Sequence, residues 1–392
     1  MLCTMKRAIR LAFLLLAGLA AGGTAAAAPV DEWTRQTAEE LNTEPIEAYW
    51  ESLLREYGGF FPEGAPPSLM EMIVPGGEGL GLGNALAGLA RYFFHQLLFN
   101  GKLLVMIVVI AVFSLLLETI QSAFEQNNVS KVAFYVSYIV LMILAVNSFS
   151  VAIGYAKSAI ESMIHFMAAM VPLLLTMLAS LGNVVTVSVM HPLIILMIHV
   201  IGTLIHTVVF PLLFFSAVLY IVSAMSDKYK VTQLAALLRN VAAGLLGVCL
   251  TVFLGVISVQ AATAAATDGI AIRTAKYVAG NFIPVVGRML SDATDTVIGA
   301  SLLVKNTVGL TGVIILILLC AFPAMKILAL ALIYNVSAAV MQPLGDSPIV
   351  GCLQTIGKSM LFVFAALASV SLMFFLAVTV LITAGNLTIM MR

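Results

Sequence analysis

Charged residues are scarce in this sequence of 392 residues, and their scarcity excludes most water-soluble proteins. Only 10% of the residues are charged, whereas 61% are hydrophobic. A typical soluble domain is about a quarter charged and about half apolar. The 19 basic and 19 acidic side chains cancel at pH 7, so no overall charge favours binding to nucleic acid. The composition indicates an all-α protein whose helices cross a membrane.

Motifs that carry out catalysis are also missing. The four cysteines, at positions 3, 249, 320 and 352, form no CxxC pair, which excludes the usual zinc and thioredoxin-like motifs. Residues 351–359 read GCLQTIGKS and place five residues between two glycines, whereas a phosphate-binding loop requires four. We therefore expect no catalytic residue, no cofactor and no metal, and we predict that the protein is not an enzyme.

Residues 1–28 have the pattern of a secretory signal peptide. Three basic residues, Lys6, Arg7 and Arg10, precede an apolar run and a group of alanines that ends at Ala28. The apolar run is shorter than the ~20 residues that cross a bilayer. We expect cleavage among residues 25–28, with an uncleaved anchor as the alternative. Export would place the following segment on the far side of the cytoplasmic membrane.

Residues 29–100 form the predicted exported segment, which is acidic. Residues 31–100 hold eleven acidic and three basic side chains. Residues 31–57 have the spacing of one or two amphipathic helices, bent near Pro45 and ended by Gly58 and Gly59. A stretch rich in proline and glycine follows and is typical of a linker. Two roles stay open for the amphipathic part: docking onto a partner, or lying at the membrane interface, where tryptophan and tyrosine are favoured.

Apolar stretches between residues 101 and 385 predict a membrane domain of about seven spans, with eight as the alternative. The fourth stretch has 34 uncharged residues. A long helix kinked at Pro211 and a tight helical hairpin both fit its length. The positive-inside rule does not separate the two counts. A short tail, residues 386–392, ends the chain. The predicted spans cover residues 103–117, 132–152, 164–181, 189–222, 241–262, 310–334 and 360–384.

Four polar side chains inside these spans are candidates for a polar pore or a proton relay, because ionisable groups in membranes are often functional. His191, His199 and His206 share one helical face, and Lys326 follows Pro323 by three residues. The histidines lie about 10–12 Å apart along a helix, too far for two of them to bind one metal ion. Neutral histidines bonded to neighbouring helices are the alternative interpretation.

Small residues recur every four positions in the fifth span, at Ala243, Gly247, Thr251 and Gly255. Helices in lipid associate by close backbone approach across such stripes. We expect this face to pack against another helix, in the same chain or in a neighbouring subunit.

The most polar part of the membrane domain is residues 265–309. Its apolar residues have helical spacing after Pro284, which predicts an amphipathic connection that lies flat on the membrane or re-enters it. Arg288, Asp292 and Asp295 are on its polar face and form a candidate partner surface.

Two stretches carry a resemblance to a known family. They read NFIPVVGRMLSDATDTVIGASLLVKNTVG and CAFPAMKILALALIYNVSAAVMQPLGDSPI, and the most specific part is residues 282–299. Together with the signal peptide and the order of the spans, they resemble the stage III sporulation protein AE family over essentially the whole chain.

The resemblance implies a role in endospore formation, after engulfment of the forespore. It places the protein in the mother-cell membrane around the forespore, as a subunit of a secretion-like channel complex. The implied partners are other proteins of the stage III sporulation A operon, including a separate ATPase and ring-forming subunits, and a forespore-membrane protein across the intermembrane space. A stand-alone permease for a small solute is the alternative. The family supplies no catalytic residue to transfer.

Overall fold

The computed structural model describes residues 43–61, 67–73, 81–123, 128–225, 230–282, 286–344 and 348–390. The predicted signal peptide lies outside the described residues, as do Trp33 and the last two residues of the tail. Every regular element in the described part of the chain is helical. The prediction of an all-α fold is therefore confirmed.

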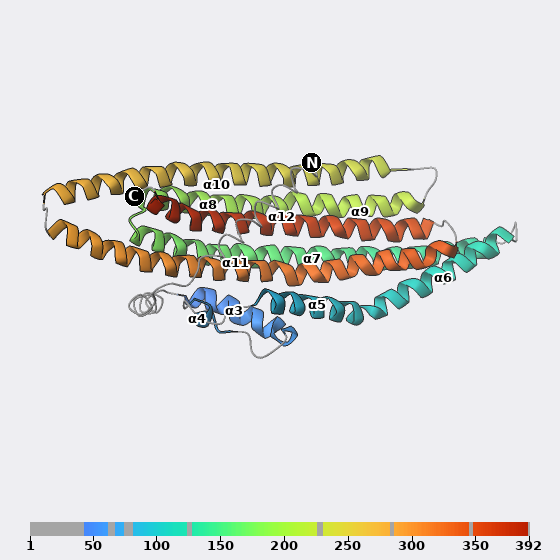
Figure 1. Cartoon of the computed structure of the whole chain (residues 1–392). Coiled ribbons are helices and arrows are strands. Elements are labelled where there is room, and N and C mark those ends of the chain that lie inside the picture. Colours follow the sequence, from blue (N-terminus) through green and yellow to red (C-terminus); the bar gives the residue numbers. More distant parts are fainter. Residues whose placement is uncertain are drawn as a thin grey trace.

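The helices fall into a short N-terminal group and a group of long helices (Figure 1). The N-terminal group comprises α3 (Glu44–Tyr57), η1 (Gly58–Phe60), α4 (Leu69–Ile73), α5 (Leu82–Phe99) and α6 (Gly101–Ala123). The second group comprises α7 (Asn128–Ser180), α8 (Val184–Leu204), η2 (Ile205–Val209), α9 (Phe210–Met225), α10 (Thr232–Phe282), α11 (Val286–Met341), η3 (Gln342–Leu344) and α12 (Pro348–Met390). The long helices form an elongated bundle, and α3, α4 and α5 lie along one side of it.

Five helices in the described part are long and apolar enough to cross a membrane, which supports a multi-pass membrane protein. A sixth candidate is the pair α5–α6, bent by 43° near Asn100. The sequence predicted seven spans, so the structure reduces the count. The five apolar segments are Tyr135–Ser180, Val184–Ser223, Thr232–Thr274, Ser301–Met341 and Pro348–Asn386.

Helix α7 accounts for one of the missing spans, because it joins the predicted second and third spans into one helix of 53 residues. The predicted first span lies in α6 and is a candidate only together with α5. The residues between the two spans, IGYAKSAIESM, contain no proline and only one glycine, so nothing there ends a helix. Pro172 lies within α7 without breaking it. At 1.5 Å per residue α7 is roughly 80 Å long, far longer than the ~30 Å apolar core of a bilayer.

The fourth apolar stretch is one long helical segment, made of α8, η2 and α9. Of the two predicted alternatives, the continuous helix is therefore correct and the hairpin is wrong. Its interruption is the π-helical turn η2, which ends just before Pro211. Pro211 has no N–H with which to bond the carbonyl four residues back. In the adjoining π-helical turn, the Phe210 N–H bonds to the Ile205 carbonyl, five residues back.

The polar region 265–309 is not a separate amphipathic helix, as the sequence predicted, but the adjoining ends of two long helices. Helix α10 runs on to Phe282 and α11 begins at Val286. Helical spacing continues on both sides of this point, so the polar residues extend the long helices.

Helix α12 forms the centre of the bundle. Its residues Met360, Val363, Leu367 and Phe374 are fully buried. Neighbouring α11 approaches closely because it carries glycine at position 309, where an added Cβ would lie 2.6 Å from a side-chain carbon of Ile382. Burial of this kind of apolar side chain is the dominant source of stability wherever the surroundings are aqueous; within lipid, close packing replaces it.

Candidate functional site

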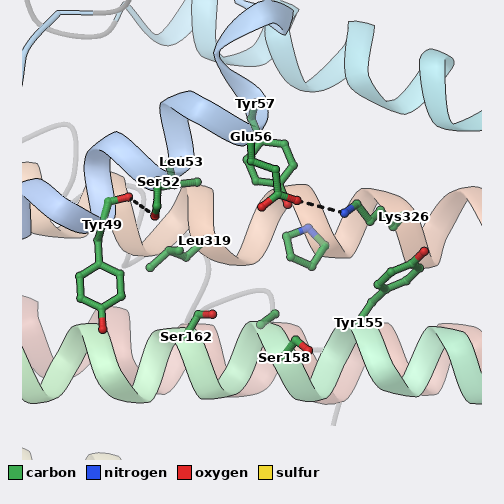
Figure 2. Close-up of a pocket in the computed structure, with 12 residues that line it drawn as sticks. Tyr49, Ser52, Leu53, Glu56, Tyr57, Tyr155, Ser158, Ser162, Leu319 and Lys326 are labelled. Atoms are coloured by element: carbon green, nitrogen blue, oxygen red, sulfur yellow. Dashed lines mark hydrogen bonds and ion pairs between the residues drawn. The ribbon is translucent and has the colours of Figure 1, made fainter.

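Helix α3 docks lengthwise on the bundle, against α7 and α11 (Figures 1 and 2). Pro45 lies in its first turn, where proline is well tolerated. Its apolar residues recur at helical spacing and are buried against the bundle: Ile46, Trp50, Leu53 and Tyr57. The indole N–H of Trp50 donates to the Pro67 carbonyl at 3.0 Å. The predicted amphipathic helix thus packs on its own chain, a role that the sequence did not indicate.

Phe322 of α11 is the centre of the aromatic contacts that hold this layer. The Tyr57 ring stacks on it with a centroid distance of 4.0 Å and an interplanar angle of 3°. Tyr92 of α5 meets it edge-on at 5.1 Å, and Phe61 does so at 6.1 Å. Burial, together with the adjacent Glu56, raises the pKa of the Tyr57 hydroxyl, so this residue stays protonated and acts as an aromatic anchor.

A cavity of about 230 Å³ lies beneath α3, between α7 and α11 (Figure 2). Six of its twelve lining residues, from two helices, carry hydroxyl groups. They belong to Tyr49, Ser52 and Tyr57 of α3 and to Tyr155, Ser158 and Ser162 of α7. Leu319 and Pro323 of α11 provide an apolar wall. The cavity is therefore suited to water or to a small polar solute.

Lys326 lies at the edge of this cavity and pairs with Glu56 at 3.4 Å. Its ammonium group also lies 5.6 Å from the centroid of the Tyr57 ring and 5.2 Å from that of Tyr155. The Glu56 side chain is 60% exposed and that of Lys326 is 20% exposed. The predicted intramembrane lysine thus has a carboxylate partner, contributed by the N-terminal segment.

The three predicted relay histidines lie on a different part of the molecule. His191 and His199 of α8 and His206 of η2 are all exposed, on the outward face of this helical segment. The Nδ1 atom of His199 lies 2.9 Å from the Ile195 carbonyl of its own helix. The structure does not bring the histidines together with one another or with Lys326, and the relay stays a prediction. Among the described residues, no group of His, Cys, Asp and Glu side chains could hold a metal ion.

The small-residue stripe of α10 faces outward. Ala243, Thr251 and Gly255 are exposed, and Gly247 is half-buried. The Thr251 hydroxyl donates to the Gly247 carbonyl at 2.8 Å, and an added Cβ on Gly255 would meet nothing within 4 Å. No described helix of this chain covers Gly255, so a helix that packs there must come from elsewhere.

The predicted partner surface is only partly described. Arg288, Asp292 and Asp295 lie on the helical backbone of α11, but their side chains lie outside the described part. Their role as a partner surface stays a prediction.

Sequence reasoning missed Lys305, which it assigned to a connection between spans. The side chain is only 1% exposed and its ammonium group donates to the Ile382 carbonyl of α12 at 2.8 Å. Gly385 makes room for it, because an added Cβ there would overlap the ammonium group. A glycine 80 residues away is a contact that no local pattern reveals.

Asp268 is the second buried charge that sequence reasoning missed. It is 2% exposed, and its two carboxylate oxygens accept the N–H groups of Val185 at 2.9 Å and Thr186 at 2.8 Å. These are two of the unpaired N–H groups at the start of α8. Asn183, the residue that precedes α8, makes no capping bond, so a carboxylate from α10 takes this role.

Comparison with known proteins gives a consistent family match. The family model for stage III sporulation protein AE matches residues 66–385. Stage III sporulation protein AE of Bacillus subtilis (strain 168) is 52% identical over 400 aligned positions, covering 99% of this chain and 100% of the relative. No solved structure matches the chain.

Proposed function

Because this chain belongs to the stage III sporulation protein AE family, we propose that it is a membrane subunit of the channel complex that connects mother cell and forespore. Membership supports a role in the third stage of sporulation. The proposal adds that the protein acts after engulfment, in the mother-cell membrane that surrounds the forespore. The observation that carries it is the 52% identity along 99% of the chain.

The described geometry supports a structural role in an assembly more than a catalytic one. The long helices pack around α12, and the exposed stripe of α10 leaves a face on which a further helix can pack. The cavity beneath α3 contains one ion pair and several hydroxyls but no metal-binding group among the described residues. We propose that the protein is not an enzyme and that it needs no cofactor.

Partners follow from the proposed complex. A separate ATPase would supply energy, ring-forming subunits of the same operon would adjoin this protein, and a forespore-membrane protein would meet it across the intermembrane space. Export directed by a signal peptide would let α3, α4 and α5 reach the bundle from that side of the membrane. The Lys326–Glu56 pair and the Phe322 cluster would then fix this exported layer on the bundle.

A deletion strain tests the proposal directly. Sporulation should stop after engulfment while vegetative growth continues, and a copy of the gene expressed only in the mother cell should restore spore formation. A copy expressed only in the forespore is the matched control and should not restore it. A normal spore yield from the deletion strain would refute the proposed role.

The cavity of about 230 Å³ lined by hydroxyl groups favours one second candidate, a stand-alone permease for a small polar solute. The purified chain in liposomes separates the two functions. Transport of a defined solute without any other protein would support the permease, whereas a requirement for the other subunits would support the complex.

A further inference from the structure

Two sides of the bundle differ in charge. One side, here called the charged flank, is formed by α3, by the middle of α7 and by Lys326 of α11. Most of its charged side chains are exposed, and Lys157 and Lys326 are half-buried. The set comprises Glu44, Glu47, Glu51, Arg55 and Glu56 of α3, Lys157 and Glu161 of α7, and Lys326 of α11.

A second surface, here called the uncharged flank, carries no charge and lies on α10 between Val241 and Thr267. This stretch contains no charged residue, and its length of roughly 40 Å is sufficient to cross a bilayer. Val252 and Val259 point outward and are 50% and 64% exposed. The hydroxyl of Thr263 donates to a carbonyl within its own helix, and Gln260 and Ser258 are exposed polar side chains without charge. In the isolated chain, with no partner helix on the Gly255 stripe, this surface is suited to lipid.

Two hydrogen bonds fix the register of α10 against the α8–α9 segment. The Ser216 hydroxyl donates to the Ala235 carbonyl at 2.7 Å, and the Val185 N–H donates to Asp268 at 2.9 Å. From the first bond to the second, the residue numbers rise from 235 to 268 in α10 and fall from 216 to 185 in the α8–α9 segment. The two segments are therefore antiparallel. Position 251 of α10 lies 17 residues from the second bond, and so does position 202 of α8. The two positions are therefore at the same level.

This level is shared by the charged flank. Gly202 lies against Ile164 of α7, because an added Cβ at Gly202 would overlap the Ile164 side chain. Ile164 is three residues from Glu161, and Phe166 meets the ring of Tyr49 of α3 at 5.6 Å. The charged flank and the middle of the uncharged flank thus occupy one level of the bundle.

From this juxtaposition we propose that the charged flank lines a water-filled passage at the depth where the uncharged flank contacts lipid. The inference rests on the membrane role proposed above. Charged side chains in the centre of a bilayer face a water-filled cavity or the interior of a bundle. Here Glu47, Glu51 and Glu161 are exposed on the outside of the chain, so a water-filled space must adjoin this flank. The cavity beneath α3 is itself lined by Glu56 and Lys326 of this flank.

Collision accessibility of spin labels tests the proposal on the full chain in lipid bilayers. Single cysteines replace Glu51 and Glu161 on the charged flank, and Val252 and Val259 on the uncharged flank, after the native cysteines have been changed to alanine. Each position carries a nitroxide. We expect a water-soluble nickel complex to relax the labels at Glu51→Cys and Glu161→Cys at least fivefold more strongly than those at Val252→Cys and Val259→Cys. Oxygen, which concentrates in lipid, should give the reverse order.

Three results would overturn the proposal. Nickel access on both flanks would place this level outside the bilayer. Oxygen access on both would place the charged flank in lipid, and low access to both reagents at Glu51→Cys and Glu161→Cys would show that protein covers it. The measurement is independent of spore formation. A deletion strain that sporulates normally would refute the proposed role without affecting the assignment of the two flanks.

Discussion

Lys326 of α11 meets Glu56 of α3 at 3.4 Å, across 270 positions of sequence. The contact joins the N-terminal layer to the long-helix bundle at the mouth of a cavity. The ion pair and the aromatic residues beside it both hold α3 against the bundle.

We predict that the ion pair contributes little to holding α3. Its two side chains are 20% and 60% exposed, and exposed pairs are worth about 0–1 kcal/mol. Tyr57→Ala should cost about 3 kcal/mol or more, because a buried aromatic ring is lost. Trypsin cleavage at the exposed Arg55 reports release of α3. It should accelerate more than tenfold in Tyr57→Ala and less than about fivefold in Glu56→Gln. Equal acceleration in both variants would contradict this ranking.

The long helices could be predicted from the sequence, but their number could not. Hydropathy located the apolar stretches around residues 132–152 and 164–181, and both lie in helix. The polar residues between them indicated a turn. Without a proline or a pair of glycines there, the backbone has no reason to leave the helix. The flanking bundle then covers one face of the polar segment, and a helix longer than a bilayer results.

The buried charges were beyond prediction for a different reason. Each depends on a partner that is distant in sequence: Lys305 on the carbonyl of Ile382, and Asp268 on the first turn of α8. Lys326 was singled out because it lies inside an apolar stretch, yet its partner Glu56 was assigned to another compartment. Periodicity identifies the face of a helix that is buried, but it does not identify what that face meets.

Asp268→Asn should destabilise the protein by about 1–3 kcal/mol. The carboxylate accepts two backbone N–H groups with separate oxygens, and an amide offers only one oxygen, so one buried N–H would lose its partner. The favourable interaction of a negative charge with the start of α8 is lost as well. Unfolding in detergent measures the change, with Thr267→Val as the exposed neighbouring control. Equal midpoints for the two variants would show that Asp268 is not the cap of α8.

Lys305 and Gly385 should be strongly coupled. A methyl group at Gly385 overlaps the Lys305 ammonium group, so Gly385→Ala should displace the ammonium from the Ile382 carbonyl and cost about 1–3 kcal/mol. In a Lys305→Met background the same change should cost less, with a remaining cost from Leu178, whose side-chain carbon lies 2.7 Å from the added Cβ. The difference gives a coupling energy within the range of about 0.5–3 kcal/mol seen for contacting residues. Denaturant titration of the four variants measures it. Gly244→Ala, where nothing lies within 4 Å, is the control. Additive effects would exclude the contact.

A leucine in the small-residue stripe should impair assembly with partners without impairing the folding of the chain. Gly255 faces open space, so Gly255→Leu should leave the unfolding midpoint of the isolated chain within about 0.5 kcal/mol of the original, as for ordinary surface substitutions. A bulky side chain there prevents the close backbone approach on which association in lipid depends. Recovery of partner proteins with the tagged chain should therefore fall sharply, and further with Gly247→Leu. Gly312→Leu is the contrasting control, because its Cβ would overlap Met170 inside the bundle and folding itself should fail. Full recovery of partners with Gly255→Leu would mean that lipid, and not another helix, covers this face.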